Sequence, residues 1–419
     1  MKNKVSILTL GCKVNKYESD CLAKKLQAMG FFVSSDLINA EYYILNTCAV
    51  TNEAEKKSRQ YISKIIRVNP NAKILVCGCA SDADKQKFLD KTGVVAVFDN
   101  QRKDLIIDYF ENKLYEDIRI SGFNYNLVDP KIDQARAYIK IQDGCNRFCS
   151  YCIIPYLRGR SVSRSIESVV TEANQLSKDY NEIVLVGIDL SDYKIDGRYA
   201  LPELLEKLSN CSARIRLGSL EVSVVTEELL SVLKDMSNFA PQFHLSLQSG
   251  DDDVLKAMNR KYTAQEYINA CNMIYKYFPN ANITTDIIVG FPGEKEENFN
   301  NTINLAKTVK FGKIHCFPFS AKKGTRAATF VDNPADIKKD RMDRLSVVAS
   351  ELQTEYNIRF IGADLMMLLE EKEGEYIVGY SENYIKCYLM TTKNLKLGEV
   401  IRVKGVELYK EGLKVRYDG

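Results

Sequence analysis

A chain of 419 residues exceeds what a single hydrophobic core ordinarily supports, so two or three domains are expected. The composition, 45% apolar and 27% charged with no low-complexity tract, excludes a disordered chain and is typical of a soluble globular protein. The net charge of +3 neither requires nor excludes a nucleic-acid partner, and no apolar stretch approaches the length that spans a membrane.

The first domain, predicted over 1–113, alternates short apolar runs with stretches of helical periodicity. The apolar runs, each predicted to be a buried strand, are residues 4–10, 41–47, 73–78 and 94–98. The helical stretches between them are 15–29, 52–68 and 82–91. This alternation favours an open parallel α/β sheet. A polar segment over 114–135 is predicted to be a linker.

The same alternation restarts with longer units in the second domain, predicted over 136–362. Six apolar runs are predicted strands: 138–142, 182–188, 214–220, 242–248, 282–290 and 313–319. They recur at intervals of about 30 to 45 residues, which suits one strand plus one crossover helix. Six such units predict a partial (β/α)6 barrel or a strongly curved sheet, so the fold class is α/β.

The third domain, predicted over 363–419, follows a long helix predicted over 337–360. Its apolar runs are short and separated by turns: 376–381, 384–391, 399–406 and 413–418. This pattern favours a small antiparallel β-barrel.

The chain has twelve cysteines but only two histidines, His244 and His315. Its N-terminal apolar run is too short for a signal peptide, so we expect a cytoplasmic protein whose thiols stay reduced. In that compartment, many cysteines favour metal or cluster binding over disulfides. The scarcity of histidine argues against a His-rich metal site and against a Cys–His nucleophile pair.

Three cysteines, Cys145, Cys149 and Cys152, occur in “GCNRFCSYC”, directly after the first predicted barrel strand. Functional sites in parallel sheets form at the carboxyl ends of the strands. The other five predicted strands end in polar, Gly-containing or turn-rich segments: 187–193, 218–223, 248–253, 290–294 and 319–325. We therefore expect one large site on this rim, with ordinary turns as the alternative.

A second trio is predicted in the first domain, where Cys12, Cys48 and Cys79 each follow a predicted strand. These three cysteines would converge on one edge of the sheet. Cys77 competes with Cys79, but it lies inside the apolar run, whereas Cys79 lies beyond Gly78, where the chain should leave the sheet. The remaining cysteines are expected to be small buried side chains: Cys21, Cys211, Cys271, Cys316 and Cys387.

Three thiolates leave a metal centre with one open position. A [4Fe-4S] cluster usually takes four thiolates, and an open position is typical of a reactive site rather than a structural one. Zinc sites would need fourth ligands, which the two histidines do not supply at suitable spacing. The pattern therefore favours two incomplete iron–sulfur clusters.

The segment “CNRFCSYC” matches the C-x3-C-x2-C signature of radical S-adenosylmethionine (SAM) enzymes, and its surroundings (136–164) resemble the methylthiotransferase family. Matches to that family continue along the chain: “TLGCKVNKYES”, “NTCAVTNEAEKKSR”, “VCGCA”, “RIRLGSLE”, “HLSLQSGDDDVLKAMNRKY”, “DIIVGFPGE” and “FPFSAKKGTRAA”. The order resembles that family's three domains: a cluster-binding domain, a radical SAM barrel and a TRAM domain that docks RNA. “TLGCKVN” rather than “TYGCQMN” resembles the branch that acts on threonylcarbamoyladenosine in tRNA.

The resemblance implies a transferase that converts N6-threonylcarbamoyladenosine, 3′ of the anticodon (position 37), to its 2-methylthio derivative. It implies two [4Fe-4S] clusters and two SAM molecules. The cluster at Cys145, Cys149 and Cys152 would bind and split SAM, and the resulting 5′-deoxyadenosyl radical would remove hydrogen from C2 of the base. The auxiliary cluster at Cys12, Cys48 and Cys79 would hold the sulfur that the second SAM methylates. The implied partners are tRNA, an electron donor such as flavodoxin or ferredoxin, and a sulfur source, with no membrane.

The resemblance also implies SAM contacts, while no side chain beyond the cluster ligands is expected to be catalytic. The candidates are Tyr151, Gly187, Asp189, Ser219, Glu221 and Gln248. Tyr151 would lie by the adenine, and the turn from Gly187 would approach the methionine amine through its backbone. A structural role in a turn or in the core is the alternative for each. We expect Asp286 and Glu294 to cap or orient loops and not to be catalytic.

A cationic patch is predicted beside the SAM site and could hold RNA phosphates or balance the charge of a cluster. Its members are Arg158, Arg160, Arg164, Lys322, Lys323 and Arg326. The third domain is a weaker candidate for RNA binding, because residues 364–419 contain nine Lys or Arg but ten Asp or Glu.

Two acceptors other than threonylcarbamoyladenosine are compatible with the same chemistry: isopentenyladenosine in tRNA, and an aspartate of a ribosomal protein. A third hypothesis is a non-enzymatic iron–sulfur protein that binds RNA or transfers electrons. It does not explain why both cysteine trios lack a fourth ligand.

Overall fold

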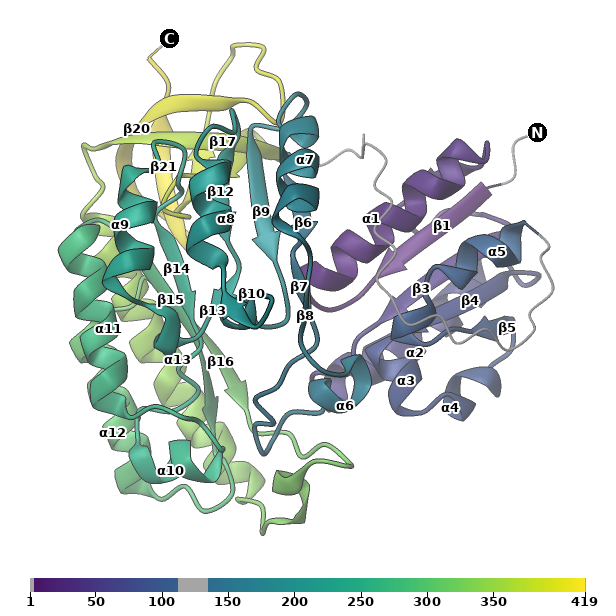
Figure 1. The fold of residues 1–419 in the computed structure, drawn as a ribbon, viewed down its shortest axis with the longest axis horizontal. Coiled ribbons are helices and arrows are strands. Elements are labelled where there is room, and N and C mark those ends of the chain that lie inside the picture. Colours follow the sequence, from purple (N-terminus) through teal and green to yellow (C-terminus); the bar gives the residue numbers. More distant parts are fainter. Residues whose placement is uncertain (1–3, 112–134, 419) are drawn as a thin grey trace.

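The N-terminal unit is an open parallel sheet with strand order β2-β1-β3-β4-β5 in the computed structural model, which describes residues 4–111 and 135–418 (Figure 1). Its strands are β1 (Lys4–Thr9), β2 (Phe32–Ser34), β3 (Tyr42–Thr47), β4 (Lys73–Gly78) and β5 (Val94–Val97). Its helices are α1 (Lys13–Ala28), α2 (Asn52–Val68), α3 (Cys79–Ala83), α4 (Gln86–Leu89) and α5 (Leu105–Phe110).

The four strands predicted in this unit are confirmed, and so are the first two helices. The third prediction, one helix over 82–91, is wrong because the chain breaks at Asp84 and Lys85 into α3 and α4. Strand β2 was not predicted, since three residues are too short to show a periodicity. The expected linker lies outside the described residues, except for its last residue.

The central unit is a curved parallel sheet whose strands follow one another in sequence order. Its six principal strands are β6 (Ala137–Lys140), β9 (Glu182–Val186), β12 (Arg214–Leu217), β14 (Gln242–Leu245), β15 (Asn282–Val289) and β16 (Lys313–Pro318). All six predicted strands are confirmed. The sheet is interrupted at Gly218, and the short strand β13 (Ser219–Leu220) pairs with β14.

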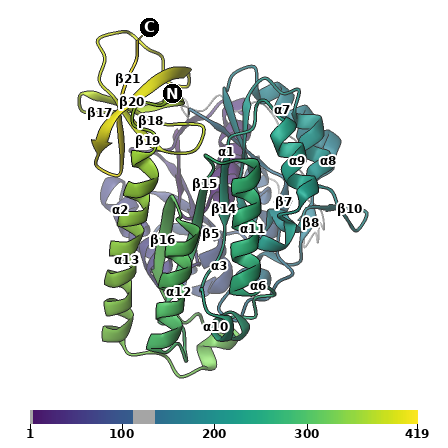
Figure 2. The ribbon, with the colours of Figure 1, turned by 90° about the vertical axis from the view of Figure 1, so that its left-hand side faces the viewer.

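Helices cover the outer face of this curved sheet, as Figures 1 and 2 show. They are α7 (Ile166–Leu176), α8 (Leu201–Leu208), α9 (Glu227–Asp235), α11 (Ala264–Tyr277), α12 (Glu296–Val309) and α13 (Ala335–Ile358). Shorter elements lie in the connections: β7 (Gln142–Asp143), α6 (Ile154–Arg158), β8 (Val162–Ser163), β10 (Lys194–Ile195), β11 (Arg198–Tyr199) and α10 (Asp252–Ala257).

Alternation along the strands separates an apolar outer face from a polar inner face. Phe243, Ile283 and Ile287 belong to the large core beneath the helices. The intervening residues, such as His244 and Asp286, therefore lie on the opposite side of the sheet, which we call the inner face.

The C-terminal unit is a closed barrel with strand order β17-β18-β19-β21-β20. Its strands are β17 (Asp364–Glu373), β18 (Tyr376–Tyr380), β19 (Lys386–Leu389), β20 (Val400–Tyr409) and β21 (Gly412–Arg416). Strand β17 was not predicted because its Leu, Met and Glu residues are strong helix formers, and pairing with β18 and β20 overrides that preference. In the described part of the chain, no helix has the length and apolar character needed to cross a membrane.

A buried ion network attaches the C-terminal barrel to the amino ends of the central strands, opposite the loop that carries Cys145 (Figure 1). Glu182, at the start of β9, pairs with Arg136 at 3.2 Å and with Arg216 at 2.9 Å, and also with Arg214. Arg216 donates hydrogen bonds to the carbonyls of Ser381 and Glu382. Burial opposes ionisation of Glu182, but the three guanidinium groups hold its pKa well below the usual range.

Substitution of Glu182 by glutamine is expected to lower the free energy of unfolding by about 3–5 kcal/mol, because it leaves buried guanidinium groups without a counter-charge. A depressed carboxyl pKa stabilises the fold above the pKa of the unfolded chain, and this stabilisation is lost as the pH falls. The difference between the two proteins should therefore be large at pH 7 and smaller in acid.

Urea unfolding followed by circular dichroism at both pH values measures this effect. Glu203→Gln is the matched control, because that carboxylate is 60% exposed and its pairing with Lys207 is long, at 3.8 Å. Equal midpoints for the two variants at pH 7 would contradict the prediction.

Candidate functional site

Cys12, Cys48 and Cys79 lie together at the carboxyl edge of the N-terminal sheet, because β1, β3 and β4 are adjacent parallel strands. Cys12 immediately precedes α1, and Cys79 is the first residue of α3. Burial, together with negative charge on Cys79 and Cys12, raises the pKa of the Cys48 thiol to about 11. The three thiols are thus near enough to influence one another's ionisation.

Gly11 allows the chain before Cys12 to pass close to Cys48. Its φ of +101° is unfavourable for other residues, and a Cβ there would lie 2.7 Å from Cβ and 2.8 Å from Sγ of Cys48. Cys77, the competing candidate, is instead fully buried in a different apolar cluster that contains Ile44 and Leu75.

The second trio occupies the loop that follows β7. The Cys152 N–H donates to the Cys149 carbonyl at 3.0 Å, and the Cys145 N–H donates to the Gly159 carbonyl at 3.1 Å. A Cβ on Gly144, whose φ is +70°, would overlap the Arg160 carbonyl oxygen. Burial raises the pKa of Cys145 to about 11 and that of Cys152 to about 12, and charge on Cys149 adds to both shifts.

A zinc ion and an iron–sulfur cluster require different distances between their thiolate ligands. A single tetrahedral zinc ion with Zn–S bonds of about 2.3 Å would bring its thiolates to about 3.8 Å from one another. Among the described residues, neither trio forms a group of ligand atoms within 4.8 Å; the group that does is His244, Asp286 and His315. A multi-iron cluster, in which each thiolate binds a different iron, does not require so close an approach of the thiolates.

Two arginines beside the second trio were not predicted. Arg260 lies 3.4 Å from the Cys149 sulfur through Nη1, and it also packs over the Tyr262 ring. Arg147, between Cys145 and Cys149, pairs with Asp189 and lies 3.1 Å from Glu221. The sequence signal for Arg147 was its place inside the cysteine motif, whereas Arg260 is brought to the site by the fold alone.

The structure brings some of the predicted SAM contacts together. Asp189 and Glu221, from the ends of two different strands, meet at Arg147 and are both buried. Gln248 is buried with a left-handed φ of +69°, and its N–H donates to the Asp286 carbonyl at 2.8 Å.

The other predicted SAM contacts lie at strand ends or beside an apolar cluster. Gly187 and Ser219 are half-buried at the ends of their strands. Tyr151 is half-buried and packs against an apolar cluster that contains Val254, Met258 and Phe319.

Half of the predicted cationic patch is not free to contact RNA. Arg158, Arg164 and Lys322 are buried and ion-paired, with Glu18 and Asp143, with Glu172, and with Glu55 respectively. The prediction that these three side chains contact RNA is therefore corrected, because their charges are used inside the protein.

The remaining members of the patch, Arg160, Lys323 and Arg326, are exposed. Arg160 lies over the Phe148 ring, at 4.6 Å from its centroid, and Phe148 contacts the exposed Tyr156 edge-to-face. This aromatic group beside the cysteine loop was not predicted.

Helix α6 connects the two trios. Ile154 and Leu157 pack in the same apolar cluster as Cys79. Arg158, at the end of α6, lies 3.0 Å from Glu18 of α1, and Lys140 of β6 lies 2.7 Å from the same carboxylate. Burial opposes ionisation of Glu18, but Arg158, Lys103 and Lys140 hold its pKa well below the usual range.

A polar cluster lies on the inner face of the central sheet. His244 Nε2 is 3.3 Å from the Asp286 carboxylate, its Nδ1 is 3.0 Å from the Thr284 hydroxyl, and its ring centroid is 5.9 Å from that of His315. Burial lowers the pKa of His315, Asp286 opposes this shift, and the charges of His244, Lys313 and Lys13 add to it. Asp286 thus faces His244 rather than capping a loop.

Lys13 is the first residue of α1, and its ammonium nitrogen lies 6.0 Å from the centroid of the Tyr384 ring. Part of the Lys13 side chain is exposed to solvent, while protein atoms around its ammonium group partly desolvate that group. Together with the nearby charges of Arg136 and Arg216, this desolvation lowers the pKa of Lys13 to about 8.

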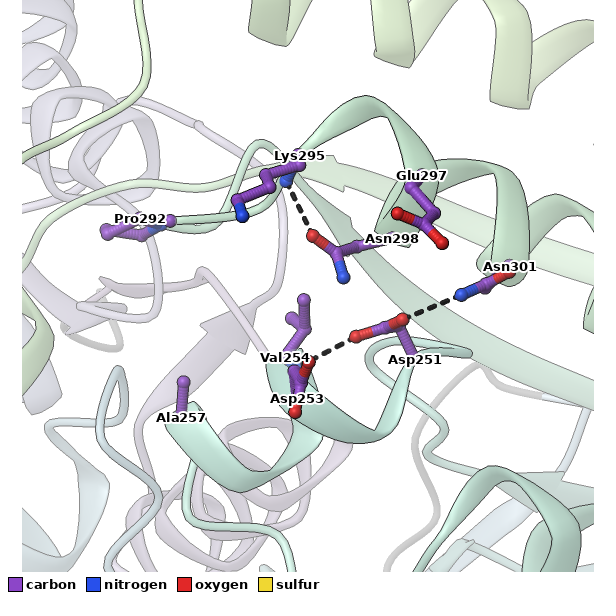
Figure 3. Close-up of a pocket in the computed structure, with 10 residues that line it drawn as sticks. Asp251, Asp253, Val254, Ala257, Pro292, Lys295, Glu297, Asn298 and Asn301 are labelled. Carbon is purple, nitrogen blue, oxygen red and sulfur yellow. Dashed lines mark hydrogen bonds between the residues drawn. The ribbon is translucent and has the colours of Figure 1, made fainter.

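A pocket of about 350 Å³ lies between α10 and the start of α12 (Figure 3). Asp251 accepts hydrogen bonds from the Val254 N–H and the Asn301 amide, and Asn298 accepts one from the Lys295 N–H. The hydrogen bonds of the Val254 and Lys295 N–H groups cap the two helices, the Asp251–Asn301 hydrogen bond joins the helices, and no cysteine lines the pocket. Nearby, Glu294 accepts from the Gly290 N–H and pairs with Arg341 at 2.7 Å, so it orients its loop.

Two family models match the chain. Residues 139–306 match the radical SAM superfamily, and residues 4–99 match the uncharacterized protein family UPF0004. The boundary between them separates the two cysteine trios.

Related proteins align over nearly the full chain. The threonylcarbamoyladenosine tRNA methylthiotransferase MtaB of Bacillus subtilis is 36% identical, covering 98% of this chain and 96% of the relative. MtaB of Thermotoga maritima is 35% identical with the same two coverages. The tRNA-2-methylthio-N(6)-dimethylallyladenosine synthase of Thermodesulfovibrio yellowstonii is 32% identical, covering 98% and 97%.

Among solved structures, the radical SAM methyltransferase TsrM of Kitasatospora setae, with cobalamin and a [4Fe-4S] cluster bound, superimposes with a TM-score of 0.56. The match covers 76% of this chain and 75% of TsrM at 15% identity. At this identity, the similarity concerns the fold alone.

Proposed function

This chain belongs to the radical SAM tRNA methylthiotransferases, and we propose that its substrate is N6-threonylcarbamoyladenosine 3′ of the anticodon, which it converts to the 2-methylthio derivative. The enzyme is a transferase that uses SAM and two [4Fe-4S] clusters. The proposal for the base is carried by the 36% identity, over the full chain, to a relative named for threonylcarbamoyladenosine.

We assign the SAM-binding cluster to Cys145, Cys149 and Cys152, and the auxiliary cluster to Cys12, Cys48 and Cys79. When bound, these clusters supply the electron that cleaves SAM and the sulfur that is transferred. The chain holds their ligands in loops that Gly11 and Gly144 allow to close. Arg260 offsets negative charge beside Cys149, and the N-termini of α1 and α3 favour an anionic centre at the other trio.

We propose that SAM is contacted around the SAM-binding cluster by five segments: Asp189, Glu221, Gln248, Ser219 and the turn at Gly187. The buried carboxylates of Asp189 and Glu221 suit the ribose hydroxyls and the amino group of SAM. Arg147 pairs with both carboxylates and holds them in place. Tyr151 is half-buried beside an apolar cluster, and we propose that it lies by the adenine of SAM.

We propose that tRNA reaches this site over the exposed face that carries Arg160, Lys323 and Arg326. These side chains suit phosphates, while Phe148 and Tyr156 offer a surface on which a loop base can stack. The other proposed partners are a one-electron donor of the flavodoxin or ferredoxin type and a sulfur source. We propose that the enzyme acts on tRNA in the cytoplasm. We further propose that the three domains span residues 1–113, 136–362 and 363–419, with a linker over 114–135.

The identity of the base is tested with anaerobically reconstituted enzyme, SAM, dithionite and two anticodon stem-loops. One stem-loop carries threonylcarbamoyladenosine and the other carries isopentenyladenosine. Mass spectrometry of the digested nucleosides should show the methylthio product from the first at a rate at least about tenfold higher, a difference of about 1.4 kcal/mol in the transition state. The second base is favoured by the 32% identity to the dimethylallyladenosine synthase, and product from that stem-loop alone would replace the proposal.

A further inference from the structure

Both histidines of the chain meet on the inner face of the central sheet. They are the only two among 419 residues, yet their ring centroids lie 5.9 Å apart. The strand register explains this: His315 of β16 pairs with Asp286 of β15, and His244 of β14 pairs with Thr284, two residues before Asp286 and on the same face. In the sequence, the scarcity of histidine argues against a His-rich site, but the fold places both imidazoles beside one carboxylate.

The three side chains offer ligand atoms at a spacing that suits one metal ion. One nitrogen or oxygen atom from each of His244, Asp286 and His315 lies within 4.8 Å of the other two. His244 Nε2 is 3.3 Å from the Asp286 carboxylate. Two ligand atoms bound to one tetrahedral ion at about 2.0–2.1 Å lie about 3.4 Å apart, whereas a charge-assisted hydrogen bond is shorter, at about 2.7–2.9 Å. The observed separation is therefore closer to that of two ligands that share an ion.

Hydrogen bonds on the far side of the His244 ring hold it in the orientation that a metal ligand needs. Its Nδ1 is 3.0 Å from the Thr284 hydroxyl, and the Gln242 amide donates to the same hydroxyl at 3.0 Å. Thr284 and Gln242 are both buried. Metal-binding histidines usually engage their second ring nitrogen in this way, which fixes the ring. Here the arrangement leaves Nε2 facing Asp286.

The site is open to solvent on the side of His315. That side chain is exposed and lines a hollow of about 400 Å³ between β16 and α13. An ion can therefore enter from solvent, and rotation of the exposed imidazole can shorten the longer ligand separations. Three protein ligands also leave at least one coordination position for water or for an oxygen of a bound molecule, as in zinc sites of the open kind.

The charges around the cluster decide whether a cation is acceptable there. Lys13 and Lys313 are positive groups that act on His315, and Asp286 is the negative group. An ion bonded to Asp286 would lie about 2 Å from its oxygen, whereas the two ammonium groups are not ligands and stay farther away. Coulomb energy falls inversely with distance, so the attraction to the carboxylate exceeds the repulsion by either lysine. Two imidazoles with one carboxylate suit Zn²⁺ better than Mg²⁺ or Ca²⁺, which prefer oxygen ligands.

We propose that His244, Asp286 and His315 bind one divalent transition-metal ion of the Zn²⁺ kind on the inner face of the central sheet. This site shares no ligand with either cysteine trio, and it does not depend on which base the enzyme modifies. The alternative is a plain hydrogen bond between His244 and Asp286, in which His315 has no part. The two arrangements differ in whether zinc binds and in whether the exposed His315 matters.

The test uses Zn²⁺ and the holoenzyme with both clusters reconstituted, so that the cysteines of the trios are occupied. Under anaerobic conditions, the affinity for zinc is measured by competition with a fluorescent chelator. X-ray absorption at the zinc edge, which iron does not disturb, then identifies the ligands. The wild-type enzyme should bind about one zinc per chain through nitrogen and oxygen at about 2.0–2.2 Å, with imidazole scattering and without sulfur at about 2.3 Å.

His315→Ala and Asp286→Asn should each weaken zinc binding by at least about 100-fold, because loss of an outer partner of a ligand alone costs about 10- to 100-fold. His315 is exposed, so its substitution should leave the fold intact. Asp253→Asn is the matched control, since it removes a carboxylate from the acidic pocket of Figure 3 and should leave the zinc affinity unchanged. Circular dichroism and an iron content of about eight per chain show that each variant keeps its fold and its clusters.

Zinc bound through sulfur, or an unchanged affinity in His315→Ala or Asp286→Asn, overturns the site. Loss of zinc binding in Asp253→Asn would place the ion in the pocket between α10 and α12 instead. Enzyme activity is not a readout here, so an error in the proposed base leaves the result unaffected.

Discussion

Cys149→Ala is expected to abolish the cleavage of SAM to 5′-deoxyadenosine. The substitution removes one of three thiolates that the cluster requires and leaves the half-buried Arg260 guanidinium without the sulfur 3.4 Å away. With dithionite and SAM under anaerobic conditions, chromatography should detect 5′-deoxyadenosine only at the level of the reaction without enzyme. The iron content should fall from about eight to about four per chain, since one of two four-iron clusters is lost.

Cys316→Ala is the control for this experiment, because that half-buried thiol lies outside both trios. It should retain cleavage and the full iron content. Cleavage at the wild-type rate in Cys149→Ala would remove the assignment of the SAM-binding cluster.

Cys48→Ala should separate the two halves of the reaction. SAM cleavage is expected to persist, because the loop from Cys145 to Cys152 is unchanged, while the methylthiolated nucleoside should disappear from the digested tRNA. Iron should again fall to about four per chain. Measuring 5′-deoxyadenosine and the modified nucleoside in the same reaction shows whether the two activities come apart.

Cys77→Ala tests the choice between neighbouring cysteines in this trio. Cys77 is fully buried among apolar side chains, so its alanine variant should still form product, whereas Cys79→Ala should behave like Cys48→Ala. The reverse outcome, with Cys77 essential and Cys79 dispensable, would contradict the auxiliary assignment.

The strands and the convergence of the cysteines were predictable because both depend on local pattern. Apolar runs of the right length identify buried parallel strands, and residues just after adjacent strands must meet at one sheet edge. Cys12, Cys48 and Cys79 are far apart in sequence, yet the order β1, β3, β4 brings them together as expected.

The role of each charged side chain was not predictable in the same way. Arg158 and Arg160 are two residues apart in one motif, but the first is buried against Glu18 and Asp143 while the second is exposed over Phe148. The partners of Arg158 come from another domain and from another strand, so no local pattern contains them. The same holds for Arg260, and for β17, whose helix-forming residues are held in a strand by their neighbours.

Helix α6 has a consequence for the order of events during turnover. Moving the N-terminal sheet away from the barrel would expose Ile154 and Leu157, at a cost of about 25 cal/mol per Å² of apolar surface, and would separate Arg158 from Glu18. These contacts therefore favour one arrangement of the two trios in the protein without RNA. A base that is stacked in an RNA loop has to unstack to reach a site between these two units, so part of the deformation in the encounter falls on the nucleic acid.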